Sequence, residues 1–145
     1  GSRNKPEYTC IGDDVNFASR AEGLTKAYGA TIVVGESTMK LAGDDFLFRD
    51  LGPVKVKGKT RGVKIYELLG TRAQVPDAAW VDVFHQGLNA FLLRDWTKAE
   101  ELFERVKALR GGTDGPSKAF LVWTKSFKAT PPDDAWDGTL ERAEK

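Results

Sequence analysis

The sequence predicts an α+β protein whose first half mixes strands with helices and whose second half is helical. In residues 31–68, β-branched and alternating apolar runs are separated by glycine turns and by one helical stretch, as in strands interleaved with helices. After a short polar connector at 71–77, apolar residues recur at helical spacing. We therefore expect one segment over 1–72 and a helical tail over 73–145, with Gly1-Ser2 as a scar of tag removal.

The first segment is expected to contain several short strands and two helices. The first helix runs from Asp13 or Asp14, as its N-cap, to Gly29. The second runs from Glu36 to Ala42 and is followed by Gly43. Glycine is the residue most common just after a helix. Apolar and polar residues alternate strictly before and after a glycine-bearing turn, which predicts a β-hairpin. The expected strands are Tyr8–Ile11, Thr31–Val34, Phe46–Arg49, Val54–Lys59 and Val63–Leu68.

The tail is expected to form three helices. Asp95 can cap the second helix, and Pro116 suits the first turn of the third, which should end before Pro131-Pro132. The first helix carries an apolar stripe, on which His85 reads as a hydrogen-bonded core histidine rather than a ligand; the stripe is Val81, Phe84, Leu88 and Leu92. Gly87, Ala99 and Phe103 are spaced as in a tetratricopeptide-like (TPR-like) helix pair, where small residues allow close crossing.

Asn16 and Arg20 are candidates for a functional pair. They are four residues apart on the first expected helix, so their side chains lie next to each other at the border of its apolar stripe. The stripe is Phe17, Ala21, Leu24 and Tyr28. Arginine offers planar bidentate donors to phosphate, and asparagine can orient a hydroxyl without adding charge. The pair suits an anionic ligand, although the same spacing also occurs on ordinary surface helices.

Five basic residues lie in or beside the expected hairpin: Lys55, Lys57, Lys59, Arg61 and Lys64. Lysines on an edge strand can simply discourage edge-to-edge pairing. Lys57, next to Gly58, is the residue best placed to contact a ligand phosphate. The net charge of +1 and the lack of interleaved aromatic residues argue against a nucleic-acid interface.

Three stretches carry a resemblance to a known family: residues 8–20 (Tyr-Thr-Cys-Ile-Gly-Asp-Asp-Val-Asn-Phe-Ala-Ser-Arg), 54–59 (Val-Lys-Val-Lys-Gly-Lys) and 65–68 (Ile-Tyr-Glu-Leu). Together they resemble the C-terminal half of a class III nucleotidyl cyclase catalytic domain, which implies a partial ferredoxin-like sheet. The tail resembles the helical tail that follows bacterial adenylate cyclase domains. The tail motifs are Arg94-Asp95-Trp96, Gly115-Pro116-Ser117, Pro131-Pro132 and Trp136-Asp137-Gly138.

The resemblance implies roles for four residues. Asn16 would orient the ribose and the reacting phosphate, and Arg20 would stabilise the pentavalent transition state as the 3′-hydroxyl displaces pyrophosphate. Lys57 would bind the terminal phosphates of ATP. Thr9 stands where the family reads the purine, and threonine there goes with adenine rather than guanine. The implied reaction is the conversion of ATP to 3′,5′-cyclic AMP in a signalling protein.

The family's metal-binding aspartates lie in the N-terminal half of its catalytic domain. Mg²⁺ or Mn²⁺ would therefore be a cofactor of the complete enzyme with no ligands in this chain, since Asp13 and Asp14 are better read as helix-capping residues. We expect this chain to be inactive alone. Its expected partners are ATP and either a second copy, as a homodimer, or the N-terminal half of the catalytic domain.

A second function class is a non-catalytic interaction or dimerisation module built on the helical tail. In that case the first segment would serve only as scaffold. Cys10 is the only cysteine, which fits a reducing compartment, and no apolar run is long enough to span a bilayer. The expected location is the cytoplasm, either as a free protein or as the cytosolic part of a membrane-anchored receptor.

Overall fold

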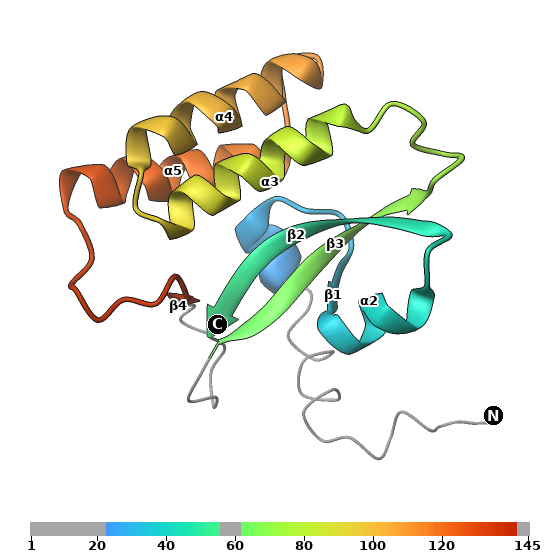
Figure 1. The fold of residues 1–145 in the computed structure, drawn as a ribbon, viewed down its shortest axis with the longest axis horizontal. Helices are drawn as coiled ribbons and strands as arrows, with labels where there is room; N and C mark the ends of the chain where they lie inside the picture. Colours follow the sequence, from blue (N-terminus) through green and yellow to red (C-terminus); the bar gives the residue numbers. More distant parts are fainter. Residues whose placement is uncertain (1–22, 56–61, 142–145) are drawn as a thin grey trace.

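The computed structural model describes residues 23–55 and 62–141 and shows an α+β fold (Figure 1). Residues 23–28 are helical and precede the labelled elements. These elements are β1 (Val33–Gly35), α2 (Glu36–Ala42), β2 (Phe46–Lys55), β3 (Val63–Thr71), α3 (Ala79–Leu92), α4 (Trp96–Leu109), α5 (Gly115–Ala129) and β4 (Leu140–Glu141). The three long helices pack together on one side of a small twisted sheet.

The sheet has the strand order β1-β3-β2-β4. Strands β1 and β2 both pair antiparallel with β3, so the expected hairpin between β2 and β3 is confirmed. Instead of two strands at 46–49 and 54–59, the described part of β2 is one strand that runs through Gly52-Pro53. The pairing register with β3 shifts between Asp50 and Gly52, and Gly52 has a φ of 84°. This β-bulge lets the strand continue through Gly52 and Pro53.

Strand β4 lies at the far end of the chain and pairs parallel with β2. It joins Leu140 to Val54 and Glu141 to Lys55. The sequence predicted only a turn and a polar end here, because two residues are too few to show an alternating pattern. Its partner strand, 86 residues earlier in the chain, decides its conformation.

The expected helix boundaries are confirmed where capping residues marked them. Asp95 accepts a hydrogen bond from the backbone N–H of Lys98 at 3.2 Å, as expected. Asp114, which the sequence did not single out as a cap, accepts one from the backbone N–H of Ser117 at 3.1 Å. Helix α5 has Pro116 in its first turn and ends before Pro131-Pro132. Helix α2 ends at Gly43, which has a φ of 79°.

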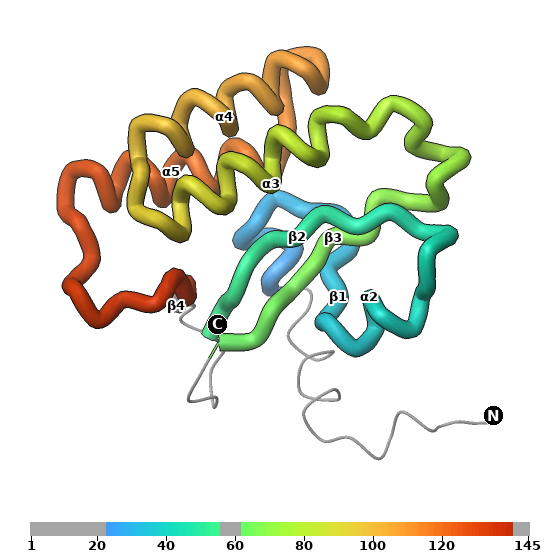
Figure 2. The backbone as a smooth tube through the Cα atoms, in the orientation of Figure 1, coloured from blue at the N-terminus to red at the C-terminus, as the bar shows by residue number. Residues whose placement is uncertain are grey.

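One hydrophobic core joins the two halves of the chain. Figure 2 shows the backbone of the three long helices lying beside that of the sheet. Phe120 of α5 lies near its centre, with ring centroids 5.3 Å from Phe103 and 5.9 Å from Tyr28 of the 23–28 segment. At Gly87, a Cβ would lie 2.9 Å from the Phe103 ring, so the predicted close crossing of α3 and α4 is present. Across residues 23–55 and 62–141, no helix has the length and apolarity that a membrane span requires.

Candidate functional site

The four residues proposed from the sequence for catalysis and substrate binding lie outside the described residues. They are Thr9, Asn16, Arg20 and Lys57, and the cap candidates Asp13 and Asp14 lie outside as well. Their roles therefore stay predictions. The structure does describe the chain from residue 23 onward and the two strands that flank Lys57 in the sequence.

The helical segment at 23–28 begins three residues after Arg20 and is held by the tail. Leu24 and Tyr28 are buried, which confirms this part of the predicted apolar stripe. The Tyr28 ring makes an edge contact with Trp123 of α5, with the centroids 5.0 Å apart. At the end of the segment, Gly29 has a φ of 68° and touches the backbone of Gly115, so a side chain at either position would collide with the other.

Lys57 lies between β2 and β3, two residues after the last described residue of β2. Val54 pairs with Val63, so the two strands remain paired up to the loop that joins them. Of the basic residues near this hairpin, Lys64 already has a partner: its ammonium lies 3.6 Å from the Asp50 carboxylate, which raises the pKa of Lys64 above its ordinary value. The Lys64 ammonium is thus already engaged by a carboxylate.

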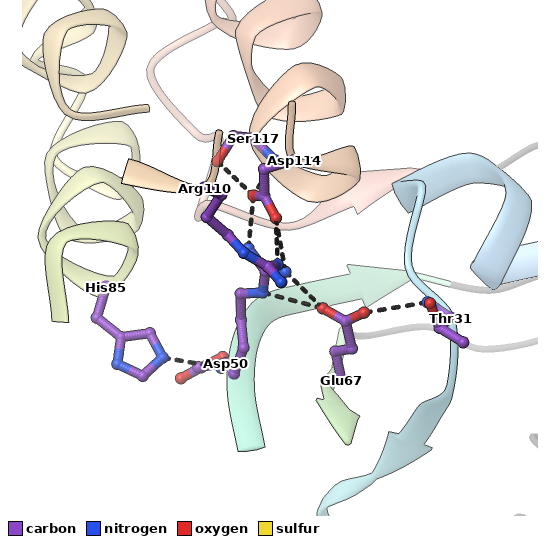
Figure 3. A network of polar contacts seen from close by, with 8 residues as sticks. Thr31, Asp50, Glu67, His85, Arg110, Asp114 and Ser117 are labelled. Carbon is purple, nitrogen blue, oxygen red and sulfur yellow. Dashed lines mark hydrogen bonds and ion pairs between the residues drawn. The ribbon is translucent and has the colours of Figure 1, made fainter. Parts of the chain in front are cut away.

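The strongest cluster of charges in the described residues surrounds Arg49 and is buried beneath the tail (Figure 3). Arg49 is 1% exposed. Its guanidinium makes two hydrogen bonds to Asp114, at 2.7 and 3.0 Å, and its Nε donates to Glu67 at 2.9 Å. The same guanidinium lies over the rings of Trp80 and Phe84, at 4.8 and 4.6 Å from their centroids.

Both carboxylates of this cluster have further partners. Asp114 accepts hydrogen bonds from Arg110, at 2.9 Å, and from the Ser117 hydroxyl, at 2.6 Å. Glu67 accepts one from the backbone N–H of Thr31 at 3.0 Å. Burial by itself would raise the pKa of Asp114, but the hydrogen bonds from Arg49 and Ser117 outweigh it and hold that pKa below its ordinary value. The cluster is therefore a hydrogen-bonded network of ion pairs that joins β2 and β3 to the start of α5.

His85 occupies the position expected of a core histidine. Its Nε2 accepts a hydrogen bond from the backbone N–H of Asp50 at 2.9 Å, and the ring is half-buried. Burial lowers the pKa of His85, because the charged form loses its hydration. The neutral ring therefore links α3 to β2.

His85 should make the stability of the fold depend on pH. Because its pKa is lower in the folded state, the stabilisation is complete above the ordinary pKa of 6.5 and is lost as the pH falls through the folded-state value. One proton allows a slope of at most about 1.4 kcal/mol per pH unit. Urea unfolding between pH 7.5 and 5.5 should show this slope. It should disappear in His85→Gln, whose amide oxygen can still accept from Asp50; an unchanged slope would contradict the assignment.

The described residues offer no ready metal centre. In residues 23–55 and 62–141, no group of three histidine, cysteine, aspartate or glutamate side chains could hold a metal ion. The carboxylates of the Arg49 cluster already accept hydrogen bonds from arginines. We derive no chemical step through a metal from these residues.

The comparisons with known proteins concern the first half of the chain. Residues 1–70 match the family model described as the adenylate and guanylate cyclase catalytic domain. Adenylate cyclase 1 of Rhizobium meliloti is 39% identical over 70 residues, which cover 48% of this chain and 10% of that protein. The terminal-differentiation-specific adenylate cyclase of Dictyostelium discoideum is 43% identical over 72 residues, covering 48% and 3%.

The adenylate cyclase of Anabaena cylindrica is 44% identical over 71 residues, covering 47% of this chain and 14% of that protein. The chain thus spans only a small part of the length of each of these relatives. No solved structure gives a significant match. Residues 1–70 are therefore similar to the catalytic domain of adenylate and guanylate cyclases.

Proposed function

We propose that this chain carries the C-terminal part of the catalytic domain of a class III adenylate cyclase, followed by a helical tail. The complete enzyme would convert ATP to 3′,5′-cyclic AMP and pyrophosphate and act as a homodimer in a signalling protein. The observation that carries the proposal is the match of residues 1–70 to the cyclase catalytic domain. The three relatives described above, all named adenylate cyclases, favour ATP over GTP.

In this proposal, four residues contact the substrate. Lys57 binds the terminal phosphates, Thr9 reads the adenine, and Asn16 holds the ribose with its 3′-hydroxyl in line with the α-phosphate. Arg20 stabilises the charge that develops on the α-phosphate oxygens as the pyrophosphate leaves. Phosphoryl transfer depends mainly on such positioning and charge compensation, which fixed asparagine and arginine side chains supply.

Mg²⁺ or Mn²⁺ would serve the complete enzyme as the Lewis acid, with ligands outside this chain. We expect the chain alone to be inactive for this reason. Its active site would need the N-terminal half of a cyclase catalytic domain in addition to the four residues proposed to contact ATP.

The test is a fusion enzyme. The N-terminal half of the catalytic domain of the Anabaena cylindrica adenylate cyclase is joined to this chain, which replaces the matching 71-residue segment of that relative. We expect the fusion enzyme to produce cyclic AMP from ATP with Mg²⁺ or Mn²⁺, and the chain alone to produce none. Production of cyclic AMP by the chain alone would contradict our expectation that the metal ligands lie outside this chain. A folded fusion enzyme without turnover would contradict the proposed function and favour the interaction module.

A further inference from the structure

A hollow lies beside the C-terminal part of α5, where the chain turns back toward the sheet. Figure 1 shows the chain leaving α5, passing through a loop and returning to the sheet as β4. The hollow has a volume of about 520 Å³ and is lined by side chains of α5, of this loop and by Lys55 at the end of β2. Binding sites for small molecules commonly have volumes of about 300–1,000 Å³. We call this feature the α5 hollow.

Three aromatic side chains line the α5 hollow: Trp123, Phe127 and Trp136. Each of them is half-buried, so part of its apolar surface stays accessible. Their other contacts lie in the core. The Trp123 ring makes edge contacts with Tyr28 and Phe120, with centroids 5.0 Å apart in each case. The rings of Phe127 and Trp136 contact each other at 5.3 Å. The core therefore holds this aromatic wall in place.

Two carboxylates of the loop also line the α5 hollow, those of Asp133 and Asp137. The Asp133 carboxylate accepts a hydrogen bond from the backbone N–H of Ala135 at 3.0 Å. The Asp137 carboxylate accepts one from the backbone N–H of Thr139, also at 3.0 Å. The hydrogen bonds from Thr139 hold the pKa of Asp137 below its ordinary value, so this group is ionised at neutral pH.

Arg94, in the turn between α3 and α4, fixes the loop. Its guanidinium donates to the carbonyl of Pro132, at 3.1 Å, and to that of Asp133, at 2.5 Å. It also lies over the Trp136 ring, 5.4 Å from the ring centroid. The fold thus holds the backbone that carries Asp133 against the helices, and the Trp136 ring already attracts one cation.

The charges that line the α5 hollow favour a cationic ligand. Among its described lining residues, two carry a carboxylate and one, Lys55, carries an ammonium. After the hydrogen bonds from Thr139, Lys55 also helps to lower the pKa of Asp137, so part of its charge is balanced within the protein. The faces of aromatic rings are electron-rich and attract cations. An anion would have to approach both carboxylates as well as these rings.

We propose that the α5 hollow binds an organic cation, with a quaternary ammonium group against the aromatic side chains. The methyl groups of such a cation gain from burial against apolar rings, and its charge is attracted by the ring faces. Asp133 and Asp137 complement the charge. A primary ammonium suits the hollow less well, because it is compact and strongly hydrated. The proposal concerns a binding site and does not depend on the proposed cyclase activity.

The test is a titration of the full chain with choline, followed by NMR through the indole N–H signals of Trp123 and Trp136. The matched probe is dimethylbutanol, the neutral isostere of choline in which a carbon atom replaces the quaternary nitrogen. We expect saturable shifts of both signals with choline. The neutral alcohol should bind at least about tenfold more weakly, because it has the same shape but no charge for the rings and carboxylates to attract.

Variants of the lining residues test which groups bind the cation. Asp133→Asn combined with Asp137→Asn should weaken choline binding about tenfold, because the amide oxygens can still accept the backbone hydrogen bonds but carry no charge. The control is Asp134→Asn, which should stay within about twofold. Asp134 is exposed in the same loop but is not among the described residues that line the hollow. Phe127→Leu should weaken choline more than dimethylbutanol, because leucine is apolar but has no π-face. Urea unfolding checks that each variant is folded.

Several results would overturn the inference. Equal binding of choline and dimethylbutanol would make the hollow a purely apolar site. Titration with choline that gives no saturable shift would also contradict it, as would saturable binding of inorganic phosphate in its place, which would point to an anion site at Lys55. An equal loss of choline affinity in Asp134→Asn and in the double variant would reduce the effect to general electrostatics. None of these results bears on the cyclase proposal, which the fusion enzyme tests separately.

Discussion

Replacing Arg20 by alanine is expected to lower the kcat of the fusion enzyme on the order of a hundredfold or more, with little change in its thermal stability. In the proposed mechanism, the guanidinium meets charge that develops only as the pyrophosphate leaves. An interaction made mainly in the transition state affects turnover more than substrate binding. Initial rates of cyclic AMP formation over a range of ATP concentrations would measure both parameters.

The matched control is Lys26→Ala, which removes a positive charge from the described helical segment that follows Arg20. Lys26 is exposed, so its loss should leave kcat within about twofold. The fold should survive both changes, because Leu24 and Tyr28 anchor this segment in the core. Equal loss of turnover in both variants would point to general electrostatics, and retained turnover in Arg20→Ala would refute the assigned role.

Replacing Arg49 by methionine is expected to destabilise the fold by about 3–5 kcal/mol, a large fraction of the stability of a typical domain. Methionine can fill much of the space between Trp80 and Phe84, so the change mainly removes charge. It leaves Glu67 without its arginine partner and deprives Asp114 of two hydrogen bonds, and both carboxylates are buried. Urea unfolding of the full chain at neutral pH measures the loss.

The control for this prediction is an exposed ion pair. Lys107 lies 3.6 Å from Glu104 on α4, and the Glu104 side chain is 54% exposed. Lys107→Met should cost no more than about 1 kcal/mol, because solvent screens such pairs. If Arg49→Met proved as mild as Lys107→Met, the Arg49 network would not hold the tail to the sheet.

The sequence predicted the elements whose signals are local. Asp95 and Pro116 lie at the helix starts that they were expected to mark. The capping role of Asp114 was not predicted. Hydrogen bonds from a side chain to a backbone three residues away depend on little beyond the neighbouring sequence. The hairpin could be predicted for the same reason, because alternation and a glycine-bearing turn specify it locally.

The main feature that the sequence analysis missed is the burial of Arg49. An arginine in a strand is usually read as a solvated side chain, and nothing nearby in the sequence marks Arg49 as buried. Its partners are 18 and 65 residues away, at Glu67 and Asp114. The one signal in the sequence for a buried partner was Asp114, the carboxylate at the start of α5. A helix-capping role explains an aspartate at this position equally well.

The sequence by itself determined the three long helices of the tail and the hairpin of β2 and β3, whereas the roles of the four residues proposed to contact ATP stay predictions. Only the tertiary structure decided that the tail shares a core with the sheet, that Arg49 is buried between two carboxylates, and that Leu140 and Glu141 pair with the end of β2. The physical reason is the range of the interactions. Propensities, caps and turns act over a few residues, whereas burial and strand pairing depend on partners brought together by the complete fold.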